Sequence, residues 1–245
     1  MPANTGRIYR KIGDWLSANT SADSLVAVTE VGVIGYFADR PMVDLLGILR
    51  PDIGDALGRG DLTYTIPHYM PDYIVLGSNL DTFGARFDKD KWFLSNYEPV
   101  ARITADEWGL EPQVIVKRTA EKVALETHNS GQDFGSKMTL EDYAINSGPL
   151  RRGDGIRVRL DWQRQKDMNQ RVLVVAYLDG PDGKMAAWAD QTLDTALWAA
   201  NRTISVYHRI YLDPALAPGK YTLGIRMVLE DQTNIIHKLG PLEVR

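Results

Sequence analysis

The sequence predicts a protein with two domains of different class, an α/β domain followed by an antiparallel β-sandwich. Over residues 1–118, short apolar segments alternate with helical or loop segments, which predicts a three-layer α/β domain with a short, mostly parallel sheet. Over residues 119–245, alternating segments recur between turn signals about every ten residues, which is typical of a jelly-roll-like sandwich. With 245 residues, of which 44% are hydrophobic, the chain is long enough for both cores.

The stretch from Glu30 to Leu49, EVGVIGYFADRPMVDLLGIL, organises the first domain. It starts at the end of one apolar run, is interrupted by Pro41 and continues into a second apolar run. We interpret it as a strand end, a helix of one to two turns, a tight turn and a second parallel strand. Pro41 forbids a continuous helix, and we expect Gly32 and Gly35 to permit close packing.

Periodicity predicts the remaining elements of this domain. Apolar residues at helical spacing predict an amphipathic helix over residues 7–17. Short apolar runs predict buried parallel strands, and two later segments are predicted as edge strands. The buried strands are 25–28, 42–45 and 71–76, and the edge strands are 97–104 and 113–117.

Eight strands are predicted for the second domain. They cover residues 123–127, 137–145, 155–162, 171–178, 184–189, 203–211, 220–229 and 235–244. The segment 156–162, IRVRLDW, alternates strictly between apolar and charged residues. We therefore expect its apolar side chains to face the core, and Arg157, Arg159 and Asp161 to face water or a partner.

Composition excludes several classes of protein. The net charge of -4 is small and the basic residues are scattered, so the electrostatic footprint of a nucleic-acid-binding protein is absent. No window approaches the roughly 18–20 consecutive apolar residues of a membrane span, so we expect a soluble chain. The absence of cysteine excludes disulfides and thiol catalysis and leaves the compartment open.

Catalytic and metal-binding motifs are missing from the sequence. The histidines, His68, His128, His208 and His237, have no metal-ligand spacing, and no phosphate-binding glycine loop or nucleophile motif occurs. We therefore predict no catalytic residue, no metal site and no cofactor.

Two carboxylates in the first domain are candidates for ligand binding. Asp44 lies inside an apolar run, where a buried carboxylate needs hydrogen bonds or an ionic partner. It either caps a following turn or pairs with Arg40 or Arg50, or it belongs to a ligand site at the carboxyl end of a parallel strand. Glu30 has the same ambiguity, and the two residues are expected at neighbouring strand ends.

Two tryptophans in the sandwich are candidates for sugar binding, because aromatic faces suit the apolar faces of pyranose rings. Trp188 and Trp198 flank a polar stretch and are the better candidates for a surface platform. Burial in the core is the competing interpretation for both.

The run VAVTEVGVIGYFADRPMVDLLGIL resembles the start of the soluble C-terminal region of bacterial polytopic membrane glycosyltransferases. That group is similar to dolichyl-phosphate-mannose protein mannosyltransferases and mycobacterial arabinofuranosyltransferases. Their pattern is E-x-G-x-x-G-Y, a turn, D-R, an apolar segment and D-L-x-G-L. The matching positions here are Glu30, Gly32, Gly35, Tyr36, Asp39, Arg40, Asp44, Leu45 and Gly47, with Ile48 in the last place. GDGIRVRLDWQ is similar to the β-sandwich that often follows in such proteins.

The resemblance implies a non-catalytic domain on the extracytoplasmic face of the cell membrane, in a cell-wall glycosyltransferase whose catalytic part lies in the membrane. The implied partners are the transmembrane part of the same polypeptide and a glycan. The domain would assist acceptor binding or cover the membrane active site. Two alternatives stay open, a free-standing hydrolase-like α/β enzyme with a site near Glu30 and Asp44, and a carbohydrate-binding or structural module.

Overall fold

The computed structural model describes residues 5–77, 89–104, 112–165 and 168–245, and the chain divides into two compact units. The first unit comprises Met1–Leu57, Leu62–Asp90 and Asn96–Glu121. The second comprises Gly58–Asp61, Lys91–Ser95 and Lys122–Arg245. Among the described helices, none combines the length and the hydropathy that crossing a bilayer requires.

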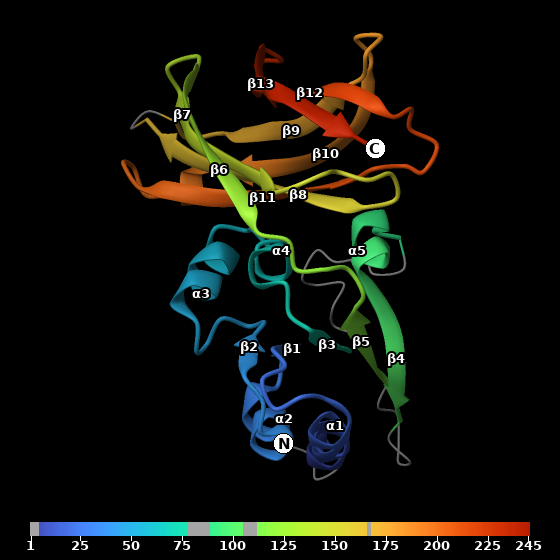
Figure 1. Cartoon of the computed structure of the whole chain (residues 1–245). Coiled ribbons are helices and arrows are strands. Elements are labelled where there is room, and N and C mark those ends of the chain that lie inside the picture. The colour runs from blue at the N-terminus through green and yellow to red at the C-terminus, as the bar shows by residue number, and fades with distance from the viewer. Residues whose placement is uncertain (1–4, 78–88, 105–111, 166–167) are drawn as a thin grey trace. The chain divides into compact units, whose positions relative to one another are not determined.

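Five short strands and several helices build the first unit (Figure 1). The helices are α1 (Thr5–Asn19), α2 (Val31–Ala38), α3 (Pro51–Gly58), α4 (Thr65–Tyr69) and α5 (Lys91–Asn96), of which α5 lies largely in the second unit. The strands are β1 (Val26–Val28), β2 (Met42–Asp44), β3 (Tyr73–Leu76), β4 (Tyr97–Ile103) and β5 (Gln113–Arg118). The short helix and the second strand predicted for the Glu30–Leu49 stretch are confirmed as α2 and β2, whereas the preceding strand β1 ends at Val28, before the stretch begins.

The sheet of this unit is mixed, with the order β2-β1-β3-β5-β4. β1 pairs in parallel with β2 and β3, as predicted, whereas β5 pairs antiparallel with both β3 and β4. The prediction of a mostly parallel sheet with β5 at an edge is therefore wrong. A strand's own residues give its burial but not the direction of its neighbour. The edge position of β4 agrees with Pro99, which cannot donate a ladder hydrogen bond.

Helices α1 and α2 bury their apolar sides against this sheet. Ile8, Ile12 and Leu16 belong to one core cluster with strand residues such as Val26 and Val28, which confirms the amphipathic helix. A long apolar stripe at helical spacing supplies most of the packing energy of such a helix.

Close approach of the two helices depends on Gly13, not on the glycines singled out in the sequence. A Cβ atom at Gly13 would lie 2.5 Å from Cβ of Phe37. At Gly32 it would meet open space, and at Gly35 it would make ordinary contact with Met42 at 3.4 Å. The expectation of close packing at Gly32 and Gly35 is therefore wrong, because both residues lie on faces of α2 that leave room for a side chain.

Arg40 connects the carboxyl ends of α1 and α2. Its guanidinium donates to the carbonyl oxygens of Ser17 (2.7 Å), Thr20 (2.9 Å), Ala38 (3.1 Å) and Asp39 (2.9 Å). Helix ends leave their last carbonyls unpaired and carry partial negative charge, so a cation with several donors is well suited to this position. Arg40 is thus engaged by the helix ends and is not the partner of Asp44.

The second unit is a sandwich of two four-stranded antiparallel sheets (Figure 1). One sheet has the order β10-β9-β12-β13 and the other β11-β8-β7-β6. The strands are β6 (Leu125–Phe134), β7 (Met138–Asn146), β8 (Gly155–Arg164), β9 (Arg171–Asp179), β10 (Met185–Asp194), β11 (Thr203–Tyr211), β12 (Gly219–Val228) and β13 (Asn234–Val244).

All eight predicted strands are present, and the β-sandwich is confirmed. The jelly-roll detail is not found, because strands adjacent in sequence mostly pair within one sheet. β6, β7 and β8 form a meander, and β9–β10 and β12–β13 form hairpins. A jelly roll consists instead of two Greek keys. Short connections between long antiparallel strands favour hairpins.

Alternation along β8 fills the core as predicted. Ile156, Val158, Leu160 and Trp162 are fully buried between the sheets. The opposite face of β8 is less exposed than expected, since Arg157 and Asp161 are also buried. Asp161 accepts hydrogen bonds from Ser205 Oγ (2.6 Å) and Arg159 Nε (3.1 Å), which offset the loss of hydration.

Candidate functional site

Asp44 ends β2 and has a structural role. Its side chain is 1% exposed. Oδ1 accepts a hydrogen bond from the backbone N–H of Leu46 (2.9 Å), and Oδ2 accepts one from that of Leu49 (2.8 Å). Gly47 lies between them at φ +70°, where its missing Cβ allows contact with the backbone of Gly54. Of the two interpretations, the geometry supports the cap of a following turn.

Glu30 lies at the same sheet edge, since β1 and β2 pair at Val28 and Asp44. It precedes α2, where its side chain makes no capping hydrogen bond. Burial raises the pKa of Tyr9 above its ordinary value, and the negative charge of Glu30 raises it further. Topology thus brings Glu30 and Asp44 to one edge, but the two Asp44 oxygens are taken up by backbone amides. A hydrolase with Asp44 as its base has no support in this geometry.

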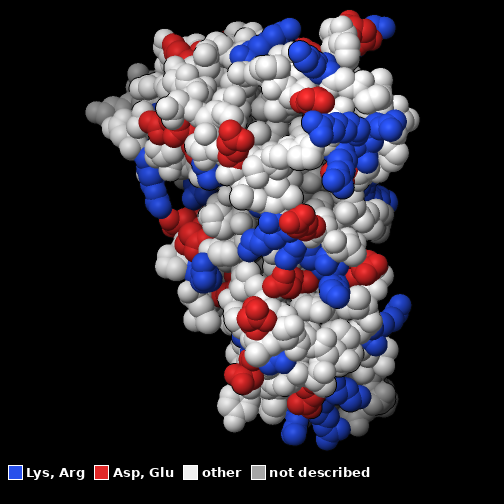
Figure 2. Space-filling model, in the orientation of Figure 1, with Lys and Arg blue, Asp and Glu red and all other residues white. Residues whose placement is uncertain are grey.

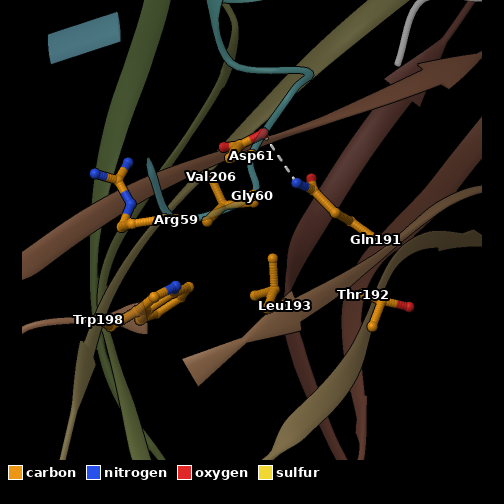
Figure 3. Close-up of a pocket in the computed structure, with 8 residues that line it drawn as sticks. All are labelled: Arg59, Gly60, Asp61, Gln191, Thr192, Leu193, Trp198 and Val206. Carbon is orange, nitrogen blue, oxygen red and sulfur yellow. Dashed lines mark hydrogen bonds between the residues drawn. The ribbon is translucent and has the colours of Figure 1, made fainter. Parts of the chain in front are cut away.

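A small pocket in the second unit lies between the edge strands β10 and β11 (Figure 3). The segment Gly58–Asp61 covers it, and Asp61 accepts a hydrogen bond from Gln191 Nε2 at 3.0 Å. Apolar side chains form the opposite wall. The lining residues are Arg59, Gly60, Asp61, Gln191, Thr192, Leu193, Trp198 and Val206.

Trp198 belongs to this apolar wall and to the sandwich core. It is 3% exposed, so the expectation of a surface platform at Trp198 is wrong. The indole lines the pocket together with Leu193 and Val206, and all three belong to the core cluster of the sandwich. The short 3₁₀ turn Thr195–Leu197, capped by the Asp194 side chain, directs the chain inward at this point.

His208 lies two residues beyond Val206 on β11 and is also buried. Its Nδ1 lies 3.3 Å from the carbonyl oxygen of Ala189 on β10. Within the described part of the chain, Nε2 has no hydrogen-bond partner. Burial lowers the pKa of His208 to about 4, so the imidazole is neutral at pH 7.

Trp188 is the exposed tryptophan of the sandwich, with 58% of its surface accessible. It lies on the outer face of the sheet β10-β9-β12-β13, in one cross-strand row with Tyr177, Gly224 and Lys238. The next row consists of Asp190, Val175, Arg226 and Ile236. Residues paired directly across antiparallel strands point to the same side of a sheet. We call the outer surface formed by these two rows the Trp188 face.

Tyr177 lies beneath the surface of this face, over the backbone of β12. A Cβ atom at Gly224 would be 2.4 Å from Cζ of the tyrosine, so the ring occupies the place of the missing side chain. The guanidinium carbon of Arg226 lies 6.0 Å from the centre of the ring. Burial raises the pKa of Tyr177, the charge of Asp179 raises it further and that of Arg226 opposes the shift.

Arg226 has an unusual environment for a partly buried cation. Within the described residues its guanidinium makes no hydrogen bond or ion pair, and its Nε is buried without a partner. On the same face, Lys238 lies 3.8 Å from Asp179. The Gly224 and Arg226 positions were missed in the sequence, although a glycine inside a predicted strand is a signal of close approach. Figure 2 shows positive and negative side chains interspersed over the side of the molecule in view.

The chain thus has a small α/β unit and a β-sandwich unit, and one outer sheet face of the sandwich carries an exposed tryptophan, a lysine and a partly buried arginine. The chain belongs to the family described as domain of unknown function (DUF8728), whose model matches residues 3–131. No curated protein matches the sequence.

Several solved structures are distantly similar. The C-terminal domain of Wzt is 14% identical, with a TM-score of 0.35 over 49% of this chain and 78% of that chain. A Niemann-Pick type C2 protein from Japanese carpenter ant is 12% identical, with a TM-score of 0.35 over 49% of this chain and 99% of that chain. A putative β-galactosidase from Bacteroides fragilis is 14% identical, with a TM-score of 0.28 over 53% and 18%. Likenesses at this level carry no information on function.

Proposed function

We propose that this chain is a non-catalytic glycan-binding module and that the Trp188 face of its sandwich contacts the glycan. One observation carries the proposal: a tryptophan 58% exposed on a regular, antiparallel sheet face, in the same row as a buried tyrosine and a lysine. A flat indole exposed to water offers its face to the C–H groups of a pyranose ring, and neighbouring polar side chains offer hydrogen bonds to hydroxyls.

The composition of the face favours a glycan over a protein partner. Its two exposed large apolar side chains, Trp188 and Ile236 (49% exposed), lie on opposite edge strands of the sheet. Between them in the two rows lie Gly224, Arg226 and the buried side chains of Tyr177 and Val175. A contiguous apolar patch, which marks a protein interface, is therefore not formed by these residues.

The Trp188→Ala variant is expected to lose glycan binding. Removal of a stacking tryptophan should weaken the affinity by at least about tenfold, or roughly 1.4 kcal/mol, while the unfolding transition stays unchanged. The test is isothermal titration calorimetry with the best ligand from a glycan array. As a matched control, Tyr36→Ala removes an aromatic that is 80% exposed on α2 of the first unit. Equal affinity of the Trp188 variant and the parent, or silence of the parent across the array, would contradict the proposal.

The Gly224→Ala variant tests whether the position of the Tyr177 ring affects glycan binding. The added methyl group overlaps the end of the Tyr177 side chain, which can rotate away without a shift of the backbone. We expect a folded protein with weakened glycan binding and a changed near-ultraviolet circular dichroism signal from tyrosine. The control is Gly183→Ala at an exposed turn, where the added Cβ would meet open space. Since Gly183 has φ +74°, this control is expected to cost some stability but not affinity.

We also propose, from the sequence resemblance, that the module belongs to the extracytoplasmic face of a membrane glycosyltransferase. Its partners would be the transmembrane part of the same polypeptide and the acceptor glycan, and not nucleic acid. The carboxylates of Glu30 and Asp44 would have no catalytic role, which agrees with the capping geometry of Asp44. The test is the reading frame upstream of Met1, where several hydrophobic spans are expected. A frame without such spans would remove this part of the proposal and leave the glycan-binding part intact.

A further inference from the structure

We propose that the glycan recognised by the Trp188 face is acidic and that Arg226 binds its anionic group. This inference rests on the proposed function of the face and adds the chemical class of the ligand. The anionic group is a uronate carboxylate or a sulfate ester, both of which offer two oxygens to a guanidinium.

The first step of the argument is the unused hydrogen-bonding capacity of Arg226. Its side chain is partly buried on β12, and within the described chain it makes neither a hydrogen bond nor an ion pair. The buried Nε has given up its hydration without gaining an acceptor, and an anion bound to the guanidinium can offset this cost. Arginine presents its donors in a planar fork that matches the two oxygens of a carboxylate.

The second step is the support that holds Arg226 in place. Its guanidinium carbon lies 6.0 Å from the ring centre of Tyr177, and that ring lies over Gly224 on the same strand as the arginine. An aromatic ring beneath a guanidinium attracts the cation and restricts its motion, while the N–H groups at the edge stay available. The arginine is thus positioned before any ligand arrives, which lowers the entropy cost of binding.

The third step is the spacing between Arg226 and Trp188. They lie in adjacent rows of the face and are separated by one intervening strand, β9. Strand spacing and rise place their Cα atoms on the order of 12 Å apart. A short oligosaccharide can therefore stack one ring on Trp188 and bring a charged substituent of a neighbouring ring to Arg226.

The other charges of the face indicate where the anion lies. Asp190 is in the same row as Arg226 but two strands away, on β10. Lys238 lies on β13, diagonal to Arg226, and its exposed ammonium group is 3.8 Å from Asp179. The side of Arg226 toward β13 is therefore the more positive one, because Lys238 lies two residues along β13 from the partner of Arg226, whereas Asp179 pairs with Thr222, four residues along β12 from Arg226. We expect the acidic group on that side.

The experiment compares the full chain with its Arg226→Gln variant on an array of neutral, uronate-bearing and sulfate-bearing oligosaccharides. The parent is expected to prefer acidic ligands, and the variant to bind them at least tenfold more weakly. Carboxyl reduction of the best uronate ligand should lower the parent's affinity to that of the variant, and the variant should not distinguish the two ligands. The matched control is Arg171→Gln, which removes an arginine of β9 that lies 3.6 Å from Asp194.

Each outcome has a distinct meaning. Binding by the parent to neutral glycans alone, abolished in Trp188→Ala and unchanged in Arg226→Gln, would overturn this inference and leave the proposed function standing. A preference for sulfated ligands over uronates, lost in Arg226→Gln, would support it and identify the anion as sulfate. Absence of binding to every glycan would overturn both proposals. An equal loss of affinity for acidic glycans in Arg171→Gln and Arg226→Gln would also contradict this inference. Such a result would indicate a general effect of positive charge rather than a binding site at Arg226.

Discussion

Replacement of Asp44 by alanine is expected to lower the free energy of unfolding by about 3–5 kcal/mol. Its carboxylate receives two backbone N–H groups, from Leu46 and Leu49, and a hydrogen bond to a charged group contributes about 1.5–3 kcal/mol. The variant leaves both amides without their acceptor and removes the constraint on the turn that contains Gly47. Urea denaturation followed by circular dichroism measures the change.

Two further variants sharpen this test. Asp44→Asn keeps one acceptor oxygen but places an amide N–H₂ group against a backbone N–H. We therefore expect a decrease in the free energy of unfolding that is smaller than that of Asp44→Ala. Asp14→Ala removes an exposed carboxylate of α1 whose ion pair with Arg10 spans 3.7 Å, and it should change stability by less than about 0.5 kcal/mol. If Asp44→Ala unfolded like the parent and instead lost a ligand, the carboxylate would belong to a binding site after all.

Acidification is expected to destabilise the protein through His208. The pKa of this buried imidazole is lowered to about 4, whereas an unfolded histidine has a pKa near 6.5. Below about pH 6.5 the unfolded chain binds a proton that the folded chain does not, so stability falls as the pH decreases toward 4 and the loss is complete below that value. The expected loss is roughly 3 kcal/mol.

The His208→Gln variant isolates this contribution. A glutamine amide can donate to the carbonyl oxygen of Ala189 as the imidazole does, but it does not titrate. The difference in unfolding free energy between parent and variant should therefore change by roughly 3 kcal/mol between pH 7 and pH 4. Parallel stability curves for the two proteins would show that His208 does not titrate in this way. Nuclear magnetic resonance of the imidazole gives the pKa directly.

Strand positions in the sandwich were predictable because each strand alternates with a period of two, and glycine-rich turns separate the strands. Ile156, Val158, Leu160 and Trp162 were assigned to the core from their spacing alone, and all four are buried. Strand order was not predictable, since alternation specifies which side chains point inward but not which strand lies beside which.

In the first unit, too, the positions of the strands were predictable from the sequence but their antiparallel neighbours were not. The apolar runs that form β1, β2 and β3 were identified as parallel strands, because short runs buried on both sides are typical of such strands. The parallel pairing of β1 with β2 and β3 is confirmed. The antiparallel position of β5 and the role of Gly13 depend on partners distant in sequence. A glycine within a helix pattern gives no sign of the residue that packs against it.

The candidate sites depended most on tertiary structure. Trp188 and Trp198 are equivalent in sequence terms, flanking one polar stretch, yet one is 58% exposed and the other 3%. The difference arises because β10 places Trp188 on the outer face, and the turn after Asp194 directs Trp198 into the core. Asp44 was recognised as a residue that needs partners, but only the folded turn shows that backbone amides supply them.

By itself the sequence determined the two classes of domain, the number of sandwich strands and the inward side of the strands, because these follow from local periodicity and turn residues. Only the tertiary structure decided the sheet orders, the fate of each tryptophan and the environment of Arg226. Gly224 and Tyr177, which position that arginine, meet through pairing of β9 with β12. The physical reason is that a binding surface on a sheet is assembled across strands, and the pairing that assembles it depends on the global packing of both sheets.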